Sequence, residues 1–129
     1  MKNPRITAKE RGLIKGALRR VFSRSDLRKA VLEEIQVSYT DPERPRVKRW
    51  SICALCDEYT PTYKIQVDHI NPIIPLDKTL EDITFDQLTN NIWCDINNLQ
   101  GICKTCHDKK TSSERKIRTA NKKEKKANE

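Results

Sequence analysis

Two cysteine pairs are the residues of this chain whose type and spacing most clearly predict chemistry. Both have a Cys-x-x-Cys spacing, Cys53 with Cys56 and Cys103 with Cys106. Thiolates at this spacing in a tight turn hold one side of a zinc ion, and two such turns complete a tetrahedral site. A redox dithiol is the alternative, but it leaves a second pair without a role. The four cysteines therefore predict a structural Zn²⁺ site.

The only two histidines of the chain lie close to these pairs. His69 follows Asp68 between the pairs, and His107 follows Cys106 directly. An imidazole can take a proton from water near neutral pH, and a carboxylate with an imidazole can hold a divalent ion. Singly, each histidine has an ordinary alternative, which is a packed or surface side chain for His69 and a Cys₃His zinc ligand for His107. Cys94 is interpreted as a small apolar residue.

The order of these residues resembles the HNH endonuclease family, whose catalytic unit is a ββα-metal fold. The resemblance covers about residues 50–112, and its matching segments are 53–56, 67–72, 98–100 and 103–111. It implies a nuclease that hydrolyses phosphodiester bonds of DNA and leaves 5′-phosphate and 3′-hydroxyl ends. The segment between His69 and Asn98 is longer than in the simplest members, so residues 76–96 are expected to form an inserted helix.

The resemblance also implies roles for individual residues. His69 is expected to act as the general base, and Asn98 to brace the loop that orients it. Asp68 and His107 are expected to hold a catalytic divalent ion, with Mg²⁺, Mn²⁺ or Ni²⁺ as candidates. Asn97 adjoins Asn98 and remains an alternative for the middle position. Neighbouring residues of a regular strand point to opposite faces, so a shared site requires the strand to end or twist at Asp68 and His69.

Local patterns predict the elements that must position these residues. Thr7 and Glu10 form a capping box for a helix over residues 7–22, and a second helix after Ser25 would complete a helical hairpin. Strands are expected over residues 46–52 and 63–70, and a helix over 84–93. Residues 95–101 are expected to be irregular, and the last helix to run from the second cysteine pair to about Arg118. The predicted fold class is α+β: a small ββα-metal (HNH) core with zinc knuckles, preceded by an N-terminal helical hairpin.

Charge is unevenly distributed along the chain. Residues 1–49 hold fourteen Lys and Arg against six Asp and Glu, residues 50–114 hold five against ten, and residues 115–129 hold seven against two. Basic flanks favour a polyanion partner, here DNA, although solvated faces are the ordinary alternative. The candidate phosphate contacts are Arg19, Arg20, Arg24, Arg28, Lys29, Lys109 and Lys110.

The predicted organisation is a basic helical extension over residues 1–45, a nuclease core over 46–120 and a basic, disordered tail over 121–129. Without an apolar leader or a membrane-length stretch, the chain is expected to be cytoplasmic, in a bacterial or phage-infected cell, with no membrane partner. Whether it is a monomer or a homodimer is left open. A non-catalytic, zinc-stapled DNA-binding module is the first rival function, and a zinc-dependent protein-interaction domain is the second.

Overall fold

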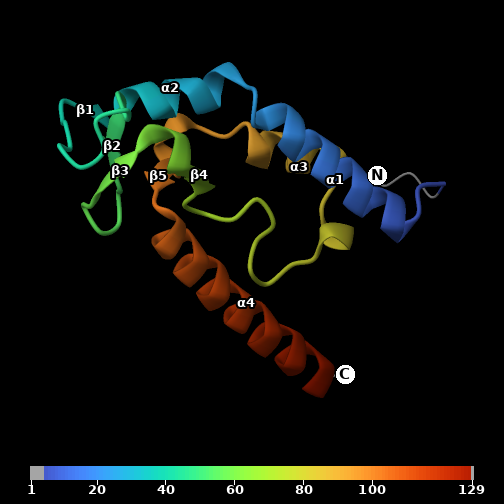
Figure 1. The fold of residues 1–129 in the computed structure, drawn as a ribbon. Helices are drawn as coiled ribbons and strands as arrows, with labels where there is room; N and C mark the ends of the chain where they lie inside the picture. Colours follow the sequence, from blue (N-terminus) through green and yellow to red (C-terminus); the bar gives the residue numbers. More distant parts are fainter. Residues whose placement is uncertain (1–4, 129) are drawn as a thin grey trace.

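The computed structural model describes residues 5–128, so residues 1–4 of the expected N-terminal extension and residue 129 of the expected tail lie outside it. The described chain folds into helices, short strands and three single 3₁₀ turns (Figure 1). The helices are α1 (Ala8–Phe22), α2 (Asp26–Glu34), α3 (Phe85–Ile92) and α4 (Lys104–Ala127). The strands are β1 (Gln36–Val37), β2 (Trp50–Ile52), β3 (Tyr59–Pro61), β4 (Gln66–His69) and β5 (Leu99–Ile102). The predicted α+β class is confirmed.

A two-stranded sheet followed by a helix forms the centre of the molecule. Strands β4 and β5 are antiparallel, with Asp68 opposite Gln100 and His69 opposite Leu99. Helix α4 begins directly after β5 (Figure 1). Gly101 of β5 allows Ile35 to pack closely against the strand, because a Cβ atom at this position would collide with the Ile35 side chain. The prediction of an irregular segment over 95–101 was therefore wrong for its second half, since pairing with β4 makes residues 99–102 a strand.

Of the N-terminal helices, α2 packs on the two-stranded sheet, and α1 packs on α3. The capping box at Thr7 and Glu10 is present, and the side chain of Ser25 caps α2. The predicted hairpin is not formed, because α1 and α2 follow each other nearly end to end across one side of the molecule (Figure 1). Phe22 of α1 and Val31 of α2 both belong to one hydrophobic cluster. The two helices therefore pack on shared core residues and do not pair with each other as a hairpin.

The hydrophobic cluster explains why the long segment between β4 and β5 is ordered. Its buried members are Phe22, Val31, Ile74, Ile83, Leu88, Ile92 and Leu99. The helix predicted over 84–93 is confirmed as α3, with the capping box of Thr84 and Gln87 at its start. Arg11 of α1 is buried against this segment, with its guanidinium over the Phe85 ring and near Glu81.

Helix α4 is longer than its sequence predicts. It continues to Ala127, beyond the expected end at Arg118 and through most of the segment 121–129 that was predicted to be disordered. Side chains of α4 donate hydrogen bonds to carbonyl oxygens of the 74–78 loop. Arg118 binds those of Ile74 and Pro75, and Asn121 binds that of Leu76. These contacts lie far apart in sequence, which is why the local composition did not reveal them.

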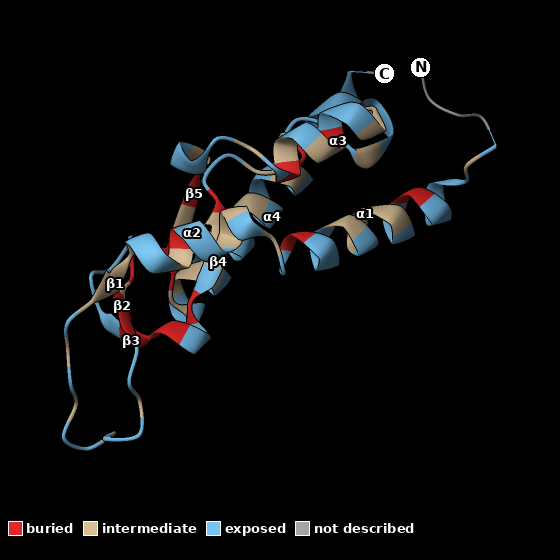
Figure 2. Cartoon of the chain, turned by 90° about the horizontal axis from the view of Figure 1, so that it is seen from above, coloured by how far each residue is buried: buried red, intermediate tan, exposed pale blue. Residues whose placement is uncertain are grey.

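A second, three-stranded sheet lies at the opposite end from the tip of α4. Its order is β1-β2-β3, so strand pairing crosses the expected domain boundary near residue 45. The β1–β2 connection, residues 38–49, is a long loop without buried residues, and the buried residues gather around the strands and inner helix faces (Figure 2). Within the described residues, no helix combines the length and apolar character needed to cross a membrane.

Candidate metal and catalytic site

The four predicted zinc ligands meet at one point. The Sγ atoms of Cys53, Cys56, Cys103 and Cys106 all lie within 4.8 Å of one another. Those of Cys56 and Cys103 are 3.8 Å apart. This separation is far too long for a disulfide, for which about 2.05 Å is required. It matches the edge of a tetrahedron around a zinc ion with Zn–S bonds of about 2.3 Å, which is about 3.8 Å. The four cysteines could thus hold a metal ion such as zinc.

Backbone N–H groups lower the pKa of one thiol of this cluster, which favours the thiolate that binds a cation. Burial raises the pKa of the Cys53 thiol, but the N–H groups of Cys103, Cys56 and Leu55 hydrogen-bond its sulfur and lower the pKa by more, to about 7. Burial and the neighbouring cysteine side chains raise the pKa of Cys106 to about 12. One thiolate is therefore favoured by the protein itself, while full deprotonation of the cluster needs a bound cation.

Each cysteine pair is fixed by the element that carries it. The first occupies the turn between β2 and β3, where Cys53 and Glu58 are joined by a backbone hydrogen bond and Asp57 has a positive φ of 60°. The N–H of Ala54 donates to the Gly101 carbonyl, which ties this turn to β5. The second pair opens α4, with Cys103 as the N-cap residue. The cluster therefore joins the two sheets to the start of the helix.

His69 lies at the end of β4 and is buried. Its ring packs against Phe22, with the ring centroids 5.3 Å apart. Its Nε2 is 2.8 Å from the Ile92 carbonyl oxygen. Because a carbonyl oxygen can only accept, this contact places the ring proton on Nε2 and leaves the lone pair of the neutral imidazole on Nδ1. The fold thus selects one tautomer of this histidine.

Asp68 is held from one side only. Its Oδ2 accepts from Gln100 Nε2 at 3.1 Å and pairs with the Lys110 ammonium at 3.2 Å. The same ammonium binds Glu114 and the His69 carbonyl oxygen, each at 3.0 Å. Among the described residues, Oδ1 of Asp68 has no hydrogen-bond or ion-pair partner. The carboxylate is therefore oriented by the protein and keeps one oxygen for another ligand.

Asn98, and not Asn97, contacts the loop that follows His69. Its side-chain oxygen accepts from the Asn71 N–H at 2.9 Å, and its amide donates to the Asn71 carbonyl at 3.3 Å. Its own carbonyl accepts from the Ile70 N–H at 2.7 Å. Asn97 is exposed, and its backbone N–H is capped by Asp95. The geometry favours Asn98 for the bracing position that the sequence left ambiguous.

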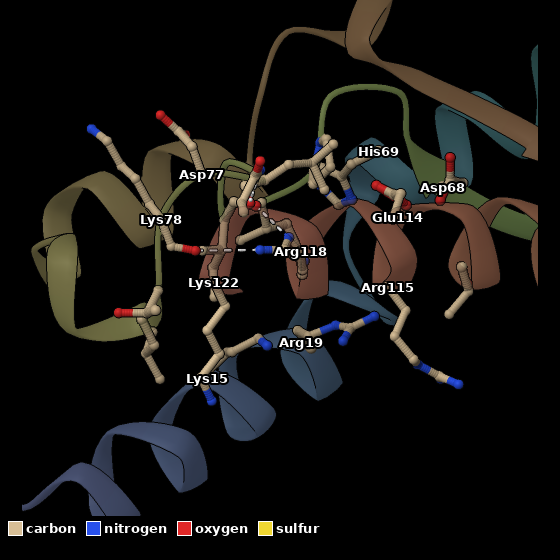
Figure 3. A pocket seen from close by; sticks show the side chains of 18 of the residues that line it. Lys15, Arg19, Asp68, His69, Asp77, Lys78, Glu114, Arg115, Arg118 and Lys122 are labelled. Carbon is tan, nitrogen blue, oxygen red and sulfur yellow. Dashed lines mark hydrogen bonds between the residues drawn. The ribbon is translucent and has the colours of Figure 1, made fainter. Parts of the chain in front are cut away.

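Asp68, His69 and His107 line one cleft of about 1060 Å³. Figure 3 shows Asp68 and His69 in this cleft. The strand ends at His69, and both Asp68 and His69 border the cleft. His107 comes from the first turn of α4, and its side chain is about one-third exposed. It does not belong to the cysteine cluster, which is the only group of three or more potential metal ligands among residues 5–128. The Cys₃His alternative is therefore disfavoured.

The predicted phosphate contacts lie on different surfaces. Arg19 lines the cleft with His69, whereas Arg20 and Arg24 line a separate hollow beside Trp93. Arg28 and Lys29 belong to α2. Lys109 is exposed on α4. Lys110, as described above, is bound to Asp68 and Glu114 in the interior of the site.

Several cleft residues were missed by sequence reasoning. Gln100 and Glu114 complete the surroundings of Asp68 and Lys110. Lys15, Arg118 and Lys122 come from the two flanking helices. A helical spacing of four residues between Lys110 and Glu114 was the only signal in the sequence for any of these contacts. Cys94 packs against the hydrophobic cluster, as expected for a small apolar residue.

Comparisons with protein-family models, with curated proteins and with solved structures find no match for this chain.

Proposed function

We propose that the protein is a metal-dependent endonuclease that hydrolyses phosphodiester bonds of DNA. The observation that carries the proposal is that Asp68, His69 and His107 all line one cleft, in a chain that also holds a four-cysteine cluster. A tautomerically fixed imidazole and a carboxylate with one unused oxygen are the groups that metal-assisted hydrolysis needs. The resemblance to HNH endonucleases in residues 50–112 supports the same assignment.

In the proposed reaction, His69 Nδ1 takes a proton from a water molecule. The resulting hydroxide oxygen bonds to phosphorus as the bond from phosphorus to the 3′ oxygen breaks in line with it. The 3′ oxygen leaves as a hydroxyl after gaining a proton from solvent, so the products carry 5′-phosphate and 3′-hydroxyl ends. The hydrogen bond from Nε2 to Ile92 stabilises the imidazolium that forms, since this donor is present in both protonation states.

Asp68 Oδ1 and a ring nitrogen of His107 are the donors that would hold the divalent ion. One carboxylate oxygen and one imidazole suit Mg²⁺ or Mn²⁺, or the borderline ion Ni²⁺, and leave several coordination positions for water and phosphate. When bound, such an ion supplies positive charge that stabilises the phosphate and the leaving oxygen. Lys110 and Gln100 keep the carboxylate in place by occupying its other oxygen.

Nicking of supercoiled plasmid by zinc-loaded protein, with Mg²⁺, Mn²⁺ or Ni²⁺ added in turn, tests the proposal. The wild type is expected to nick, and His69→Ala to be slower by about 10²–10⁴-fold, the usual contribution of a general base. Zinc content and thermal melting of the variant verify that it is folded. End labelling of the nicked strand should detect a 5′-phosphate.

The same experiment separates the rival functions. Nicking that His69→Ala retains at equal zinc content would refute the assigned role of His69. DNA binding without nicking in the presence of any of the three metal ions would favour the first rival function, a zinc-stapled DNA-binding module. Absence of DNA binding even at low salt would favour a protein-interaction domain, since phosphate contacts are strongest under that condition.

A further inference from the structure

We propose that the cleft between α1, α4 and the 72–80 loop binds the sugar–phosphate backbone of duplex DNA on one side of the scissile phosphate. This inference rests on the proposed function, because it takes the end of the cleft at Asp68 and His107 as the point of cleavage. It assigns the binding surface to two helices that come from opposite ends of the chain. Arg28 and Lys29 of α2 lie outside this surface.

The charge of the cleft is the first observation. Eight of its lining residues are Lys or Arg and three are Asp or Glu. Two of the acidic residues, Asp68 and Glu114, are already paired with Lys110. The acidic middle of the sequence therefore does not produce an acidic cleft, because α1 and the end of α4 surround it with cations.

The second observation is that most of these cations are not neutralised by the protein. The side chains of Lys15, Arg19, Arg115, Lys122 and Lys126 have no ion-pair or hydrogen-bond partner among the described residues. Lys15 and Arg19 of α1 and Lys122 of α4 lie in the space between the two helices (Figure 3). Such a cluster of like charges is costly without anions and becomes favourable when phosphates occupy it.

The environment of Lys15 shows the cost of this crowding. Burial lowers the pKa of its ammonium, and the positive charges of Arg19 and Arg118 lower it further. Arg118 itself is occupied by loop carbonyl oxygens, so it fixes the cleft wall and adds charge without needing to move. An anion placed between these side chains would relieve the repulsion.

The third observation is the alignment of the cations along α4. Successive residues of a helix are rotated by about 100°, so His107, Arg118, Lys122 and Lys126 fall within about 100° of one another on one face. Lys122 lies about 22 Å along the helix axis from His107. One DNA strand carries a phosphate about every 3.4 Å of its axis, so this distance corresponds to about six or seven base pairs.

The lining favours a duplex over a single strand. No Phe, Tyr or Trp lines the cleft, whereas proteins that hold single strands stack bases on aromatic rings. Contacts from Lys and Arg to phosphates position a protein on the duplex without carrying sequence information. Binding through this cleft is therefore expected to be insensitive to sequence and strongly dependent on salt.

Fluorescence anisotropy with a labelled DNA duplex, measured without added divalent ions, tests the cleft directly. The variant of the cleft, called the groove variant below, carries Lys15→Gln, Lys122→Gln and Lys126→Gln in the full, zinc-loaded chain. Each lost phosphate contact should reduce the slope of log affinity against log salt by about 0.9, so the three together should reduce it by about 2–3. Affinity near 0.1 M salt should fall at least tenfold.

A matched control has the same change of net charge on another surface. It carries Lys9→Gln, Lys48→Gln and Lys64→Gln, three exposed residues outside the cleft. The proposal expects its slope to stay within about half a unit of the wild type. Equal losses in both variants, or no loss in the groove variant, would overturn the proposal, because binding would then follow net charge or another surface. Tighter binding to an RNA duplex of equal length would overturn the assignment to DNA.

The design separates this inference from the proposed function. If the protein binds DNA through the cleft but never nicks it, the cleft assignment stands and the nuclease proposal fails. If the triple variant of the cleft nicks plasmid and binds DNA as the wild type does, the nuclease proposal stands and the cleft assignment fails. Zinc content and melting temperature of both triple variants verify that each is folded before binding is compared.

Discussion

The cysteine cluster and the proposed Asp68–His107 site differ in the metal ligands that they would offer. The cluster brings four sulfur atoms within 4.8 Å of one another, which is a complete donor set for a tetrahedral ion. The proposed pair would contribute one oxygen and one nitrogen, both from residues that line an open cleft. Closed four-ligand sites are typical of structural zinc, and sites with open positions are typical of catalytic metals. The difference predicts that the first ion contributes to folding and the second to activity.

The two regions also differ in how they are supported. The cysteine pairs sit in a strand turn and a helix start, each fixed by backbone hydrogen bonds. Asp68 and His69 are oriented by side chains and carbonyl groups from distant segments, including Gln100, Lys110 and Ile92. Substitutions in the first region should therefore affect stability, whereas substitutions in the second should affect metal use and rate.

Loss of the structural ion should have the largest effect. Small zinc domains gain about 10–16 kcal/mol from metal binding, which is as large as the whole stability of a typical domain. Cys56→Ala, or chelation of the wild type, is therefore expected to abolish bound zinc and cooperative unfolding. Mass spectrometry under native conditions and circular dichroism during thermal melting measure both.

Cys94→Ala is the matched control for this substitution. Cys94 packs against the hydrophobic cluster and lies outside the metal group, so the variant should keep its zinc and its cooperative melting. If the wild type still melts cooperatively at the same temperature after complete chelation, the cluster is not needed for folding, and its assigned structural role is wrong.

The part of the architecture that could be predicted is the part fixed by local patterns. The capping boxes of α1 and α3 mark elements whose residues are neighbours in sequence. The strand expected over residues 63–70 forms only over 66–69, because residues 62–64 make a 3₁₀ turn. The cysteine cluster was also predictable, although its halves are far apart, because zinc imposes both the ligand type and the spacing within each pair.

The rest depends on contacts between distant segments. Strand β5 contains Gln100 and Gly101, which do not favour a strand, and it forms because β4 pairs with it and Ile35 packs over Gly101. The end of α4 is polar and reads as disordered, yet Asn121 hydrogen-bonds a loop more than forty residues away. The basic cleft could not be inferred for the same reason, since residues of α1 and α4 come to line one cleft only in the fold.

Removing the charge of Asp68 should have the second largest effect in this comparison, and its main consequence should be weaker metal use, because Lys110 keeps Glu114 as an ion-pair partner. Asp68→Asn keeps the shape of the side chain but weakens its hold on a divalent ion, whose affinity depends on ligand charge. The metal concentration for half-maximal nicking is expected to rise by about tenfold or more. Zinc content should not change, because Asp68 is not part of the cysteine cluster.

Asp77→Asn is the control for this effect, since Asp77 lines the same cleft and loses the same charge. It is expected to leave the half-maximal metal concentration within about twofold of the wild type, as for surface substitutions away from a site. Equal shifts in both variants would show that the cleft attracts ions only through its overall charge.

The smallest effect is expected at Asn98, which supports the loop after His69 without touching the cleft residues named above. Asn98→Ala removes two hydrogen bonds to Asn71 and should cost about 1–2 kcal/mol in unfolding free energy, measured by urea titration. Nicking should slow by more than this loss of folded protein explains, because the loop sets the position of His69. Asn97→Ala should stay within about 0.5 kcal/mol, since only its backbone N–H is bonded. If the two variants have the same stability and rate, the bracing role belongs to neither asparagine, and the orientation of His69 must depend on Ile92 and Phe22 alone.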